Sequence, residues 1–212
     1  MLYYILLPLA WLLWHIGFRI QVIGREHLIR DRGFILAPNH VSAIDPVFVI
    51  IARFWGGKMR VFAKRELFEI NAFLTWFFRQ MGGVAVRGTG RDEKEVVERT
   101  IEECRAGRGL LIFPEGTRTK DGAVGSPKSG AFVVAAAAGV DLIPCRILYD
   151  TPDGRMRLFC RVRVVFGEPI PAAALAMEGK RDIKKLKAAK QLLVQRWDEL
   201  YQRNHFPERK SA

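Results

Sequence analysis

Short apolar runs alternate with amphipathic segments along most of the chain. Runs that are apolar throughout, or that alternate between apolar and polar residues, predict strands at residues 33–38, 59–63, 84–86, 110–113, 142–148 and 158–166. Helical apolar patterns and favourable caps, such as Asp45-Pro46, predict helices at residues 45–52, 68–81, 92–105, 128–138 and 183–201. This order predicts an α/β domain with a mostly parallel central sheet flanked by helices.

Residues 1–18 form an apolar segment without any Lys, Arg, Asp or Glu. As a helix it would be roughly 27 Å long, at the short limit for a bilayer span. No signal-peptide cleavage site follows it, and Arg19 and Arg25 come next, so we expect an uncleaved membrane-anchoring segment that spans the bilayer or lies in one leaflet. A buried core helix is the alternative, which an apolar surface on all sides disfavours. Residues 19–212 then form one cytoplasmic domain, which includes a basic amphipathic helix at about residues 178–204.

The charge of the chain is strongly positive. Its 212 residues include 34 Lys and Arg against 22 Asp and Glu, which gives a formal net charge of +12. Such an excess predicts a polyanionic partner: a phospholipid surface, a nucleic acid or an acidic carrier protein. The sequence has no Walker loop, no G-x-G-x-x-G motif and no RNP-like or zinc-finger pattern, so it supports neither a nucleotide cofactor nor a nucleic-acid partner. The three cysteines are far apart and suggest neither disulfides nor a zinc site.

A histidine and an acid follow the first predicted strand. His40 comes directly after this strand, and Asp45 lies five positions later, where the next helix begins. Residues at this spacing do not share a helix face, so they can meet only if the chain turns between them. The carboxylate could then hold one imidazole nitrogen and leave the other as a general base. By spacing alone, the commoner case is that Asp45 only caps the helix and His40 is an ordinary loop histidine.

No serine or cysteine nucleophile motif accompanies this pair. A general base without a protein nucleophile suits a reaction in which the substrate supplies the nucleophile. A substrate hydroxyl that attacks an activated acyl group is one such reaction.

A second candidate loop reads Phe-Pro-Glu-Gly-Thr-Arg at residues 113–118, directly after a predicted strand. In α/β domains, ligands bind beyond the carboxyl ends of the strands. Arg118 could clamp a phosphate, Gly116 would let the backbone approach a ligand, and Thr117 could add donors. The alternative is a surface turn with a solvated arginine. Three further cations lie near predicted elements, at Lys64, Arg87 and Lys128, and each by itself is typical of a solvated surface.

Taken in order, these pieces resemble the 1-acylglycerol-3-phosphate acyltransferase family, the lysophosphatidic acid acyltransferases and their relatives. The resemblance covers about residues 18–170 and rests on a series of blocks. The blocks are N-H-x-x-x-x-D (Asn39, His40, Asp45), A-K-x-E-L-F leading to G-x-x-x-x-R (Lys64, Glu66, Leu67, Gly82, Arg87), F-P-E-G-T-R (residues 113–118), and P-K-x-G (Pro127, Lys128, Gly130) followed by a strand with Pro144. Two positions depart from the family pattern: Asn71 stands where the family often has Pro, and Val86 stands where it often has an acid. Both differences bear on the identity of the acceptor lipid more than on the acyl-transfer chemistry.

The resemblance implies a glycerolphosphate acyltransferase-like fold and a role for each matched residue. His40 would take the proton from a glycerol hydroxyl, and Asp45 would orient His40. The implied substrate-binding residues are Glu115, Gly116, Thr117, Arg118 and Arg87, to which we add Lys64 and Lys128 as the cations of the matched blocks. The implied reaction moves a fatty acyl group from acyl-CoA or acyl carrier protein to the 2-hydroxyl of 1-acyl-glycerol-3-phosphate and gives phosphatidic acid.

We therefore expect a 1-acylglycerol-3-phosphate O-acyltransferase of phospholipid synthesis on the cytoplasmic face of a membrane. Its expected partners are lysophosphatidic acid, an acyl thioester as co-substrate, the membrane and, as one candidate donor, acyl carrier protein. A thiolate leaves readily, so we expect no metal and no cofactor. Two alternatives stay open: acyl transfer to another lyso-lipid, such as a lysophospholipid or an acylated amino-acid lipid, and a non-catalytic peripheral membrane protein that binds anionic lipid.

Overall fold

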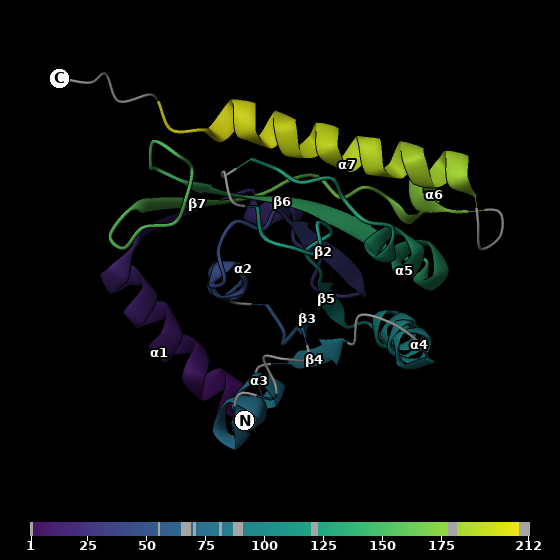
Figure 1. The fold of residues 1–212 in the computed structure, drawn as a ribbon, viewed down its shortest axis with the longest axis horizontal. Helices are drawn as coiled ribbons and strands as arrows, with labels where there is room; N and C mark the ends of the chain where they lie inside the picture. The colour runs from purple at the N-terminus through teal and green to yellow at the C-terminus, as the bar shows by residue number, and fades with distance from the viewer. Residues whose placement is uncertain are drawn as a thin grey trace.

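The computed structural model describes residues 2–54, 56–64, 69, 71–80, 82–86, 91–119, 123–177 and 182–207. Within them the chain forms a seven-stranded sheet with helices on both faces (Figure 1). The strands are β1 (Arg19–Ile23), β2 (Phe34–Pro38), β3 (Arg60–Lys64), β4 (Gly83–Val86), β5 (Gly109–Leu111), β6 (Asp141–Tyr149) and β7 (Arg161–Phe166). The helices are α1 (Leu2–Gly17), η1 (Arg25–His27, a 3-10 turn), α2 (Asp45–Ala52), α3 (Ala72–Gln80), α4 (Arg91–Arg105), α5 (Gly130–Ala138), α6 (Ala172–Leu175) and α7 (Ile183–Asn204).

The strands of the sheet follow the order β1-β7-β6-β2-β5-β3-β4. Every neighbouring pair is parallel except β6 and β7, which form an antiparallel hairpin. The prediction of a mostly parallel sheet flanked by helices is therefore confirmed. β2 lies between β5 and β6, and all of its residues are buried, which explains its uninterrupted apolar sequence.

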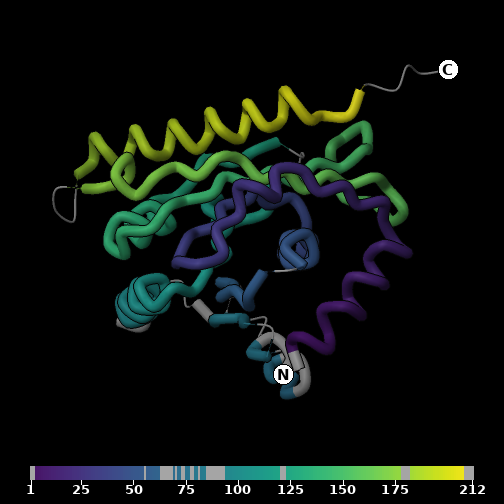
Figure 2. Tube along the Cα trace, turned by 180° about the vertical axis from the view of Figure 1, so that it is seen from behind, coloured from purple at the N-terminus to yellow at the C-terminus, as the bar shows by residue number. Residues whose placement is uncertain are grey.

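Separate apolar cores cover the two faces of the sheet. On one face α1 and α2 pack against the strands, with Phe48 and Ile51 almost completely buried. On the other face lie α5 and α7, with Phe132 and Trp197 buried against the sheet. The indole Nε1 of Trp197 donates a hydrogen bond of 2.9 Å to the carbonyl oxygen of Ala37, which ties α7 to the central strand. Figures 1 and 2 show α7 along one side of the sheet and α1 and α2 on the other.

Most predicted elements agree with the observed ones to within a few residues. The edge strand β1 is not predicted, because its alternating sequence, RIQVI, is only five residues long and comes almost directly after the apolar N-terminal segment. β7 begins at Arg161 instead of residue 158, because residues 158 and 159 lie in a turn. The basic C-terminal helix begins at Ile183 in the described part of the chain, and residues 178–181 lie outside it.

The apolar N-terminal segment forms α1, which is 16 residues long. One side of α1 packs on the domain, where Tyr3 and Leu7 are buried. None of the helices in the described residues combines the length and the hydropathy that crossing a bilayer requires.

Candidate active site

Loops that are far apart in the sequence meet at one edge of the sheet. β2, β5 and β6 are parallel neighbours, so their carboxyl ends point to the same edge. His40 lies just beyond the end of β2, and the 113–118 loop lies just beyond the end of β5. β6 continues past the end of β2 as far as Tyr149. This edge is where α/β domains bind their ligands, as the sequence predicts.

His40 and Asp45 are in direct contact. The Nδ1 atom of His40 lies 2.9 Å from Oδ2 of Asp45, and the Asp45 side chain is completely buried. The same Oδ2 accepts hydrogen bonds of 2.7 Å from the backbone N–H groups of Val41 and Ser42. The chain therefore turns around the carboxylate, and this turn brings together two residues that are five positions apart and would not meet on one helix face. Asp45 does more than begin α2, because the groups it binds lie upstream of the helix.

This contact fixes the tautomer of His40. An ionised carboxylate can only accept, so Nδ1 carries the proton, and Nε2 is left with a lone pair. No described residue forms a hydrogen bond or an ion pair with Nε2, and the His40 side chain is 18% exposed. The ring of Phe113 lies against the imidazole, with 4.1 Å between the ring centroids. His40 is therefore oriented as a general base that a substrate can reach.

Tyr149 supports Asp45 from β6, and the sequence reasoning missed it. Its hydroxyl donates a short hydrogen bond to Oδ1 of Asp45, on the side away from His40. Burial raises the pKa of Tyr149 well above its ordinary value, and the negative charge of Asp45 raises it further, so the phenol stays a neutral donor. The sequence around Tyr149 does not indicate this contact, because β6 and α2 are far apart in the sequence and come together only in the folded chain.

Replacing Tyr149 by phenylalanine removes this donor and leaves Oδ1 of Asp45 buried without it. We expect the free energy of unfolding to fall by about 1–3 kcal/mol, as is usual when a buried charged group loses a hydrogen bond. Urea unfolding monitored by circular dichroism measures this change. Tyr4→Phe, at an exposed position on α1, is the control and should leave the stability unchanged. Equal stability of wild type and Tyr149→Phe would contradict the assigned contact.

Asn39 joins β2 to β6 beyond the end of the strand. Its side-chain oxygen accepts a hydrogen bond of 2.7 Å from the backbone N–H of Ile147, and its amide nitrogen donates one of 3.3 Å to the Ile147 carbonyl. Asn39 is buried, and its side chain continues the pairing of the two strands directly before His40. The first residue of the N-H-x-x-x-x-D block therefore has a structural function, which is to hold the backbone that carries the histidine.

Glu115 joins the loop after β2 to the loop after β5. One carboxylate oxygen accepts a hydrogen bond of 2.8 Å from the backbone N–H of His40, and the other accepts one of 2.9 Å from Gly125. Burial raises the pKa of Glu115, and these two hydrogen bonds oppose that shift. In return, the backbone N–H of Thr119 donates to the carbonyl oxygen of His40 at 2.9 Å. The structure therefore gives Glu115 a positioning role beside the general base.

The residues after Glu115 form an exposed turn beside His40. Gly116 has a φ of 70°, which favours glycine, and a Cβ atom there would lie only 2.9 Å from Nζ of Lys128. Thr117, Arg118 and Lys128 are exposed, and Lys128 is held in place by a hydrogen bond of 2.8 Å from its backbone N–H to the Pro114 carbonyl. The loop thus carries the exposed cation Arg118, with Lys128 next to Gly116, and its following residue Thr119 is bonded to the backbone of His40.

Arg146 is a buried cation that the sequence analysis did not single out. It lies on β6 and is 7% exposed, and its Nε and Nη1 atoms have no hydrogen-bond partner among the described residues. Its guanidinium carbon lies 5.3 Å from the centroid of the Tyr201 ring on α7. Burial lowers the pKa of Arg146 to about 10, and the charge of Glu115 opposes this shift. The only signal in the sequence is one cation within the apolar run that follows Asp141 in β6.

The remaining predicted site residues lie partly outside the described chain. Lys64 is the last residue of β3 and pairs with Val86, the last residue of β4, so both strands end at the same edge as β5. The side chain of Lys64 is outside the described part of the chain, and so are Glu66 and Arg87. Their predicted roles stay predictions.

The fold and the site together define an α/β protein whose sheet edge carries a hydrogen-bonded His–Asp pair and a loop with an exposed arginine. Residues 19–148 match the model of the family described as "Acyltransferase". This range holds both loops of the site, and the chain belongs to the acyltransferase family.

Curated relatives agree with this family. The chain is 32% identical over 160 residues to the chloroplastic 1-acyl-sn-glycerol-3-phosphate acyltransferase LPAT1 of Arabidopsis thaliana, covering 72% of this chain and 44% of the relative. It is 31% identical over 140 residues to a 1-acyl-sn-glycerol-3-phosphate acyltransferase of Borreliella burgdorferi, covering 66% and 54%. A protein of the same name from Bacillus subtilis is 27% identical over 183 residues, covering 85% and 87%. The chain spans about half the length of the first of these relatives.

A solved structure has the same fold. The crystal structure of the 1-acyl-sn-glycerophosphate acyltransferase PlsC from Thermotoga maritima superposes with a TM-score of 0.67 at 24% sequence identity. The alignment covers 97% of this chain and 80% of the other.

Proposed function

We propose that this protein is a 1-acylglycerol-3-phosphate O-acyltransferase. It moves a fatty acyl group from acyl-CoA or acyl carrier protein to the 2-hydroxyl of 1-acyl-glycerol-3-phosphate and forms phosphatidic acid for phospholipid synthesis. The observation that carries the proposal is the buried Asp45 carboxylate on Nδ1 of His40, with Nε2 left as the acceptor. The names of the relatives favour lysophosphatidic acid over another lyso-lipid as the acceptor.

In this reaction the substrate supplies the nucleophile. Nε2 of His40 takes the proton of the 2-hydroxyl while its oxygen attacks the thioester carbonyl carbon, and Asp45 stabilises the imidazolium that forms. The new C–O ester bond forms and the C–S bond breaks. The thiolate leaves and takes up the proton, which returns His40 to its neutral form. No metal, no further cofactor and no acyl-enzyme is needed, because a thiolate is a good leaving group.

The acceptor phosphate is proposed to bind at the turn formed by Gly116, Thr117 and Arg118. Arg118 and Lys128 are exposed cations of the loops that pack on the backbone of His40, and the absence of a Cβ at Gly116 leaves room for Lys128. A guanidinium can bind a phosphate through two parallel hydrogen bonds. By the family resemblance, Arg87 and Lys64 are proposed to add further positive charge. A phosphate held here would keep the neighbouring glycerol hydroxyl near the imidazole.

The direct test is acyl transfer from a radiolabelled acyl thioester to lysophosphatidic acid in phospholipid vesicles, with the labelled lipid product identified by mass. Labelled phosphatidic acid is the expected product. A panel with lysophosphatidylcholine and lysophosphatidylglycerol tests the choice of acceptor, because these head groups lack a terminal phosphate. If no thioester is consumed with any acceptor, the protein is not an acyltransferase, and the alternative of a non-catalytic lipid-binding protein is favoured.

Replacing Arg118 by alanine should raise the KM for lysophosphatidic acid about 10-fold or more and change kcat much less. The physical reason is the loss of a charge-assisted phosphate contact, which is typically worth about 1.5–3 kcal/mol. Initial rates at varied acceptor concentration measure both constants. Arg203→Ala, which removes an exposed arginine at the end of α7, is the matched control. An unchanged KM for Arg118→Ala would remove Arg118 from the phosphate site.

The source of the acceptor is proposed to be a membrane that the protein contacts at its cytoplasmic face. α1 supports this, because it contains no Lys, Arg, Asp or Glu and its outer side is apolar and exposed. Such a helix can lie in one leaflet with its apolar side in the lipid. The basic helix α7 covers the opposite face of the sheet (Figure 1), so its cations and the apolar side of α1 do not lie on one surface.

A further inference from the structure

The apolar surface of α1 extends beyond the helix itself. The outward side chains of α1 that are more than half exposed are Tyr4, Ile5, Leu9, Leu12, Leu13 and Ile16. The turn of the β6–β7 hairpin adds Leu158 and Phe159, which are 64% and 68% exposed. Large apolar side chains that gather on one surface of a protein mark a binding surface, whereas single ones do not. We call these eight residues the apolar face.

The turn that carries Phe159 has an unusual conformation. The backbone N–H of Cys160 donates to the carbonyl oxygen of Arg157, so residues 157–160 form a β-turn with Phe159 at its third position. Phe159 has a φ of 64°, and among the described residues it is the one residue other than glycine with a positive φ. Glycine or asparagine is favoured at such a position, and a bulky side chain is strained there. This strained backbone carries an aromatic side chain that is 68% exposed to solvent.

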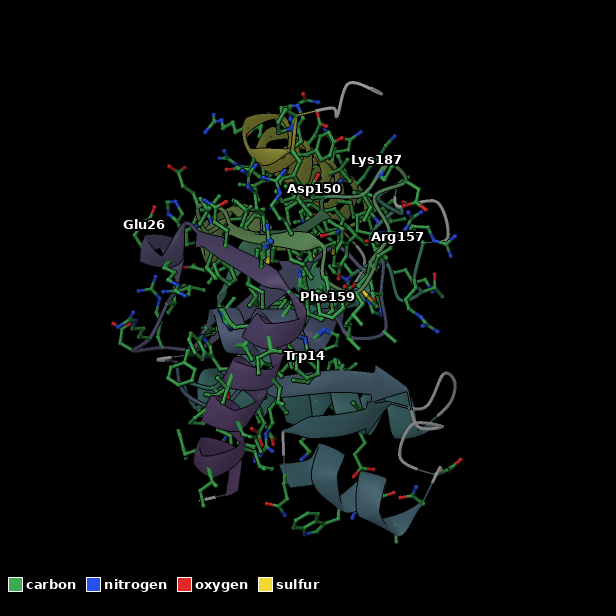
Figure 3. All side chains as sticks on the ribbon, turned by 90° about the vertical axis from the view of Figure 1, so that its left-hand side faces the viewer. Trp14, Glu26, Asp150, Arg157, Phe159 and Lys187 are labelled. Atoms are coloured by element: carbon green, nitrogen blue, oxygen red, sulfur yellow. The ribbon has the colours of Figure 1, made fainter. Side chains whose placement is uncertain are left out.

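Hydrogen bonds fix this turn to the end of α1. The backbone N–H of Phe159 donates to the carbonyl oxygen of Gly17 at 2.8 Å, and the N–H of Arg19 donates to the carbonyl oxygen of Cys160. Figure 3, which looks onto this side of the molecule, shows Phe159 next to the end of α1 that carries Trp14. The turn and the outer side of α1 therefore form one continuous surface.

The unpaired charges named around this surface are positive. Arg19 lies two residues after the end of α1, and Arg155 and Arg157 lie in the hairpin. The side chains of all three arginines are exposed. Arg157 pairs with Asp153 at 3.0 Å, while Arg19 and Arg155 form no ion pair within the described residues. An apolar surface with cations at its edge complements a membrane that contains anionic phospholipids.

We propose that the 157–160 turn inserts Leu158 and Phe159 into the same anionic phospholipid leaflet that α1 contacts. This inference rests on the proposed function, in which a membrane supplies the acceptor. Because both α1 and the turn contact the leaflet, they fix the orientation of the domain on the membrane. Contact through α1 alone would leave the domain free to rotate about the helix. The hairpin begins directly after Tyr149, which is bonded to Asp45. The same orientation therefore brings the sheet edge with His40 towards the membrane surface.

The test measures vesicle binding of the full chain without any acyl donor. Co-sedimentation with phosphatidylcholine vesicles, with and without phosphatidylglycerol, gives the partition coefficient of wild type and of Phe159→Asn. Asparagine tolerates a positive φ and removes the apolar ring, so this variant should fold at least as well as wild type, which thermal unfolding checks. Ile183→Asn is the matched control, because Ile183 is 76% exposed and lies on α7.

Phe159→Asn should lower the partition coefficient on the phosphatidylglycerol vesicles roughly 10-fold, the effect expected when one large apolar side chain no longer enters the lipid. Ile183→Asn should leave it unchanged. Hydrogen–deuterium exchange of wild type should show slower exchange at residues 155–160 when anionic vesicles are added. A partition coefficient of Phe159→Asn equal to wild type, or an equal loss in Ile183→Asn, would overturn the proposal.

The same variants separate this proposal from the other uses of the surface. If wild type is a dimer without lipid and Phe159→Asn is a monomer, the apolar face joins two copies of the chain and the membrane proposal is wrong. Acyl transfer to a short-chain lysophosphatidic acid dissolved as monomers should be equal in wild type and Phe159→Asn. An inactive wild type that still binds vesicles through Phe159 would contradict the proposed reaction and leave the membrane contact standing.

Discussion

Replacing His40 by alanine is expected to lower kcat for acyl transfer by about 100-fold to 10,000-fold, because His40 is the proposed group that takes the proton of the acceptor hydroxyl. The expectation depends on geometry: Asp45 holds Nδ1 of His40 at 2.9 Å, which leaves Nε2 as the acceptor. The KM for the acceptor should change little, since the proposed phosphate site is the turn after Glu115 and does not include His40. Initial rates with labelled thioester measure both constants.

The control for this variant is His205→Ala, which removes an exposed histidine at the end of α7. It should retain the wild-type rate. His40→Ala should destabilise the fold less than Tyr149→Phe, because Oδ2 of Asp45 keeps its hydrogen bonds from the backbone N–H groups of Val41 and Ser42. The backbone contacts of residue 40 to Glu115 and Thr119 also remain. A His40→Ala enzyme that keeps the wild-type rate would exclude the proposed mechanism.

Replacing Asp45 by asparagine is expected to lower kcat by about 100-fold or more, because a neutral amide stabilises the imidazolium much less than a carboxylate does. The folded structure should tolerate this change. The amide oxygen can still accept from Val41 and Ser42, and the Tyr149 hydroxyl can turn to accept from the new amide nitrogen. A loss of rate at nearly unchanged stability therefore separates the electrostatic role of Asp45 from its packing role.

Rate and unfolding are measured on the same preparation of Asp45→Asn, so that the rate refers to folded protein. Asp31→Asn, in an exposed loop, is the matched control and should have the wild-type rate. If Asp45→Asn is as active as wild type, the carboxylate does not assist the base, and His40 acts alone or not at all.

The contact between His40 and Asp45 could be predicted as one of two alternatives because the two residues lie close together in the sequence. His40 follows a strand whose apolar run is unmistakable, and Asp45-Pro46 marks the start of a helix, so the pattern places both residues at a strand–helix loop. The family resemblance then supplied the reaction. The spacing alone did not decide between a helix cap and a catalytic pair, because that choice depends on how the backbone turns around the carboxylate.

The supporting residues could not be predicted, because they come from distant parts of the chain. Tyr149 is 104 positions from Asp45, and Ile147 is 108 positions from Asn39. A local pattern also misplaced the start of β7, since Leu158 and Phe159 look like strand residues in the sequence. Only the fold shows that they lie in a turn against the end of α1, with Phe159 at a positive φ.

The sequence by itself determined which segments form strands and helices, where the two loops of the site begin, and the positive charge of the whole chain. Each of these follows from short-range properties: the repeat of apolar residues, the caps and the residue types of a motif. The tertiary structure decided which loops share an edge of the sheet, that Glu115 binds the backbone of His40, and that α1 and α7 cover opposite faces. The physical reason is that strand order and helix placement follow from burying two apolar cores at once, and no single segment contains that information.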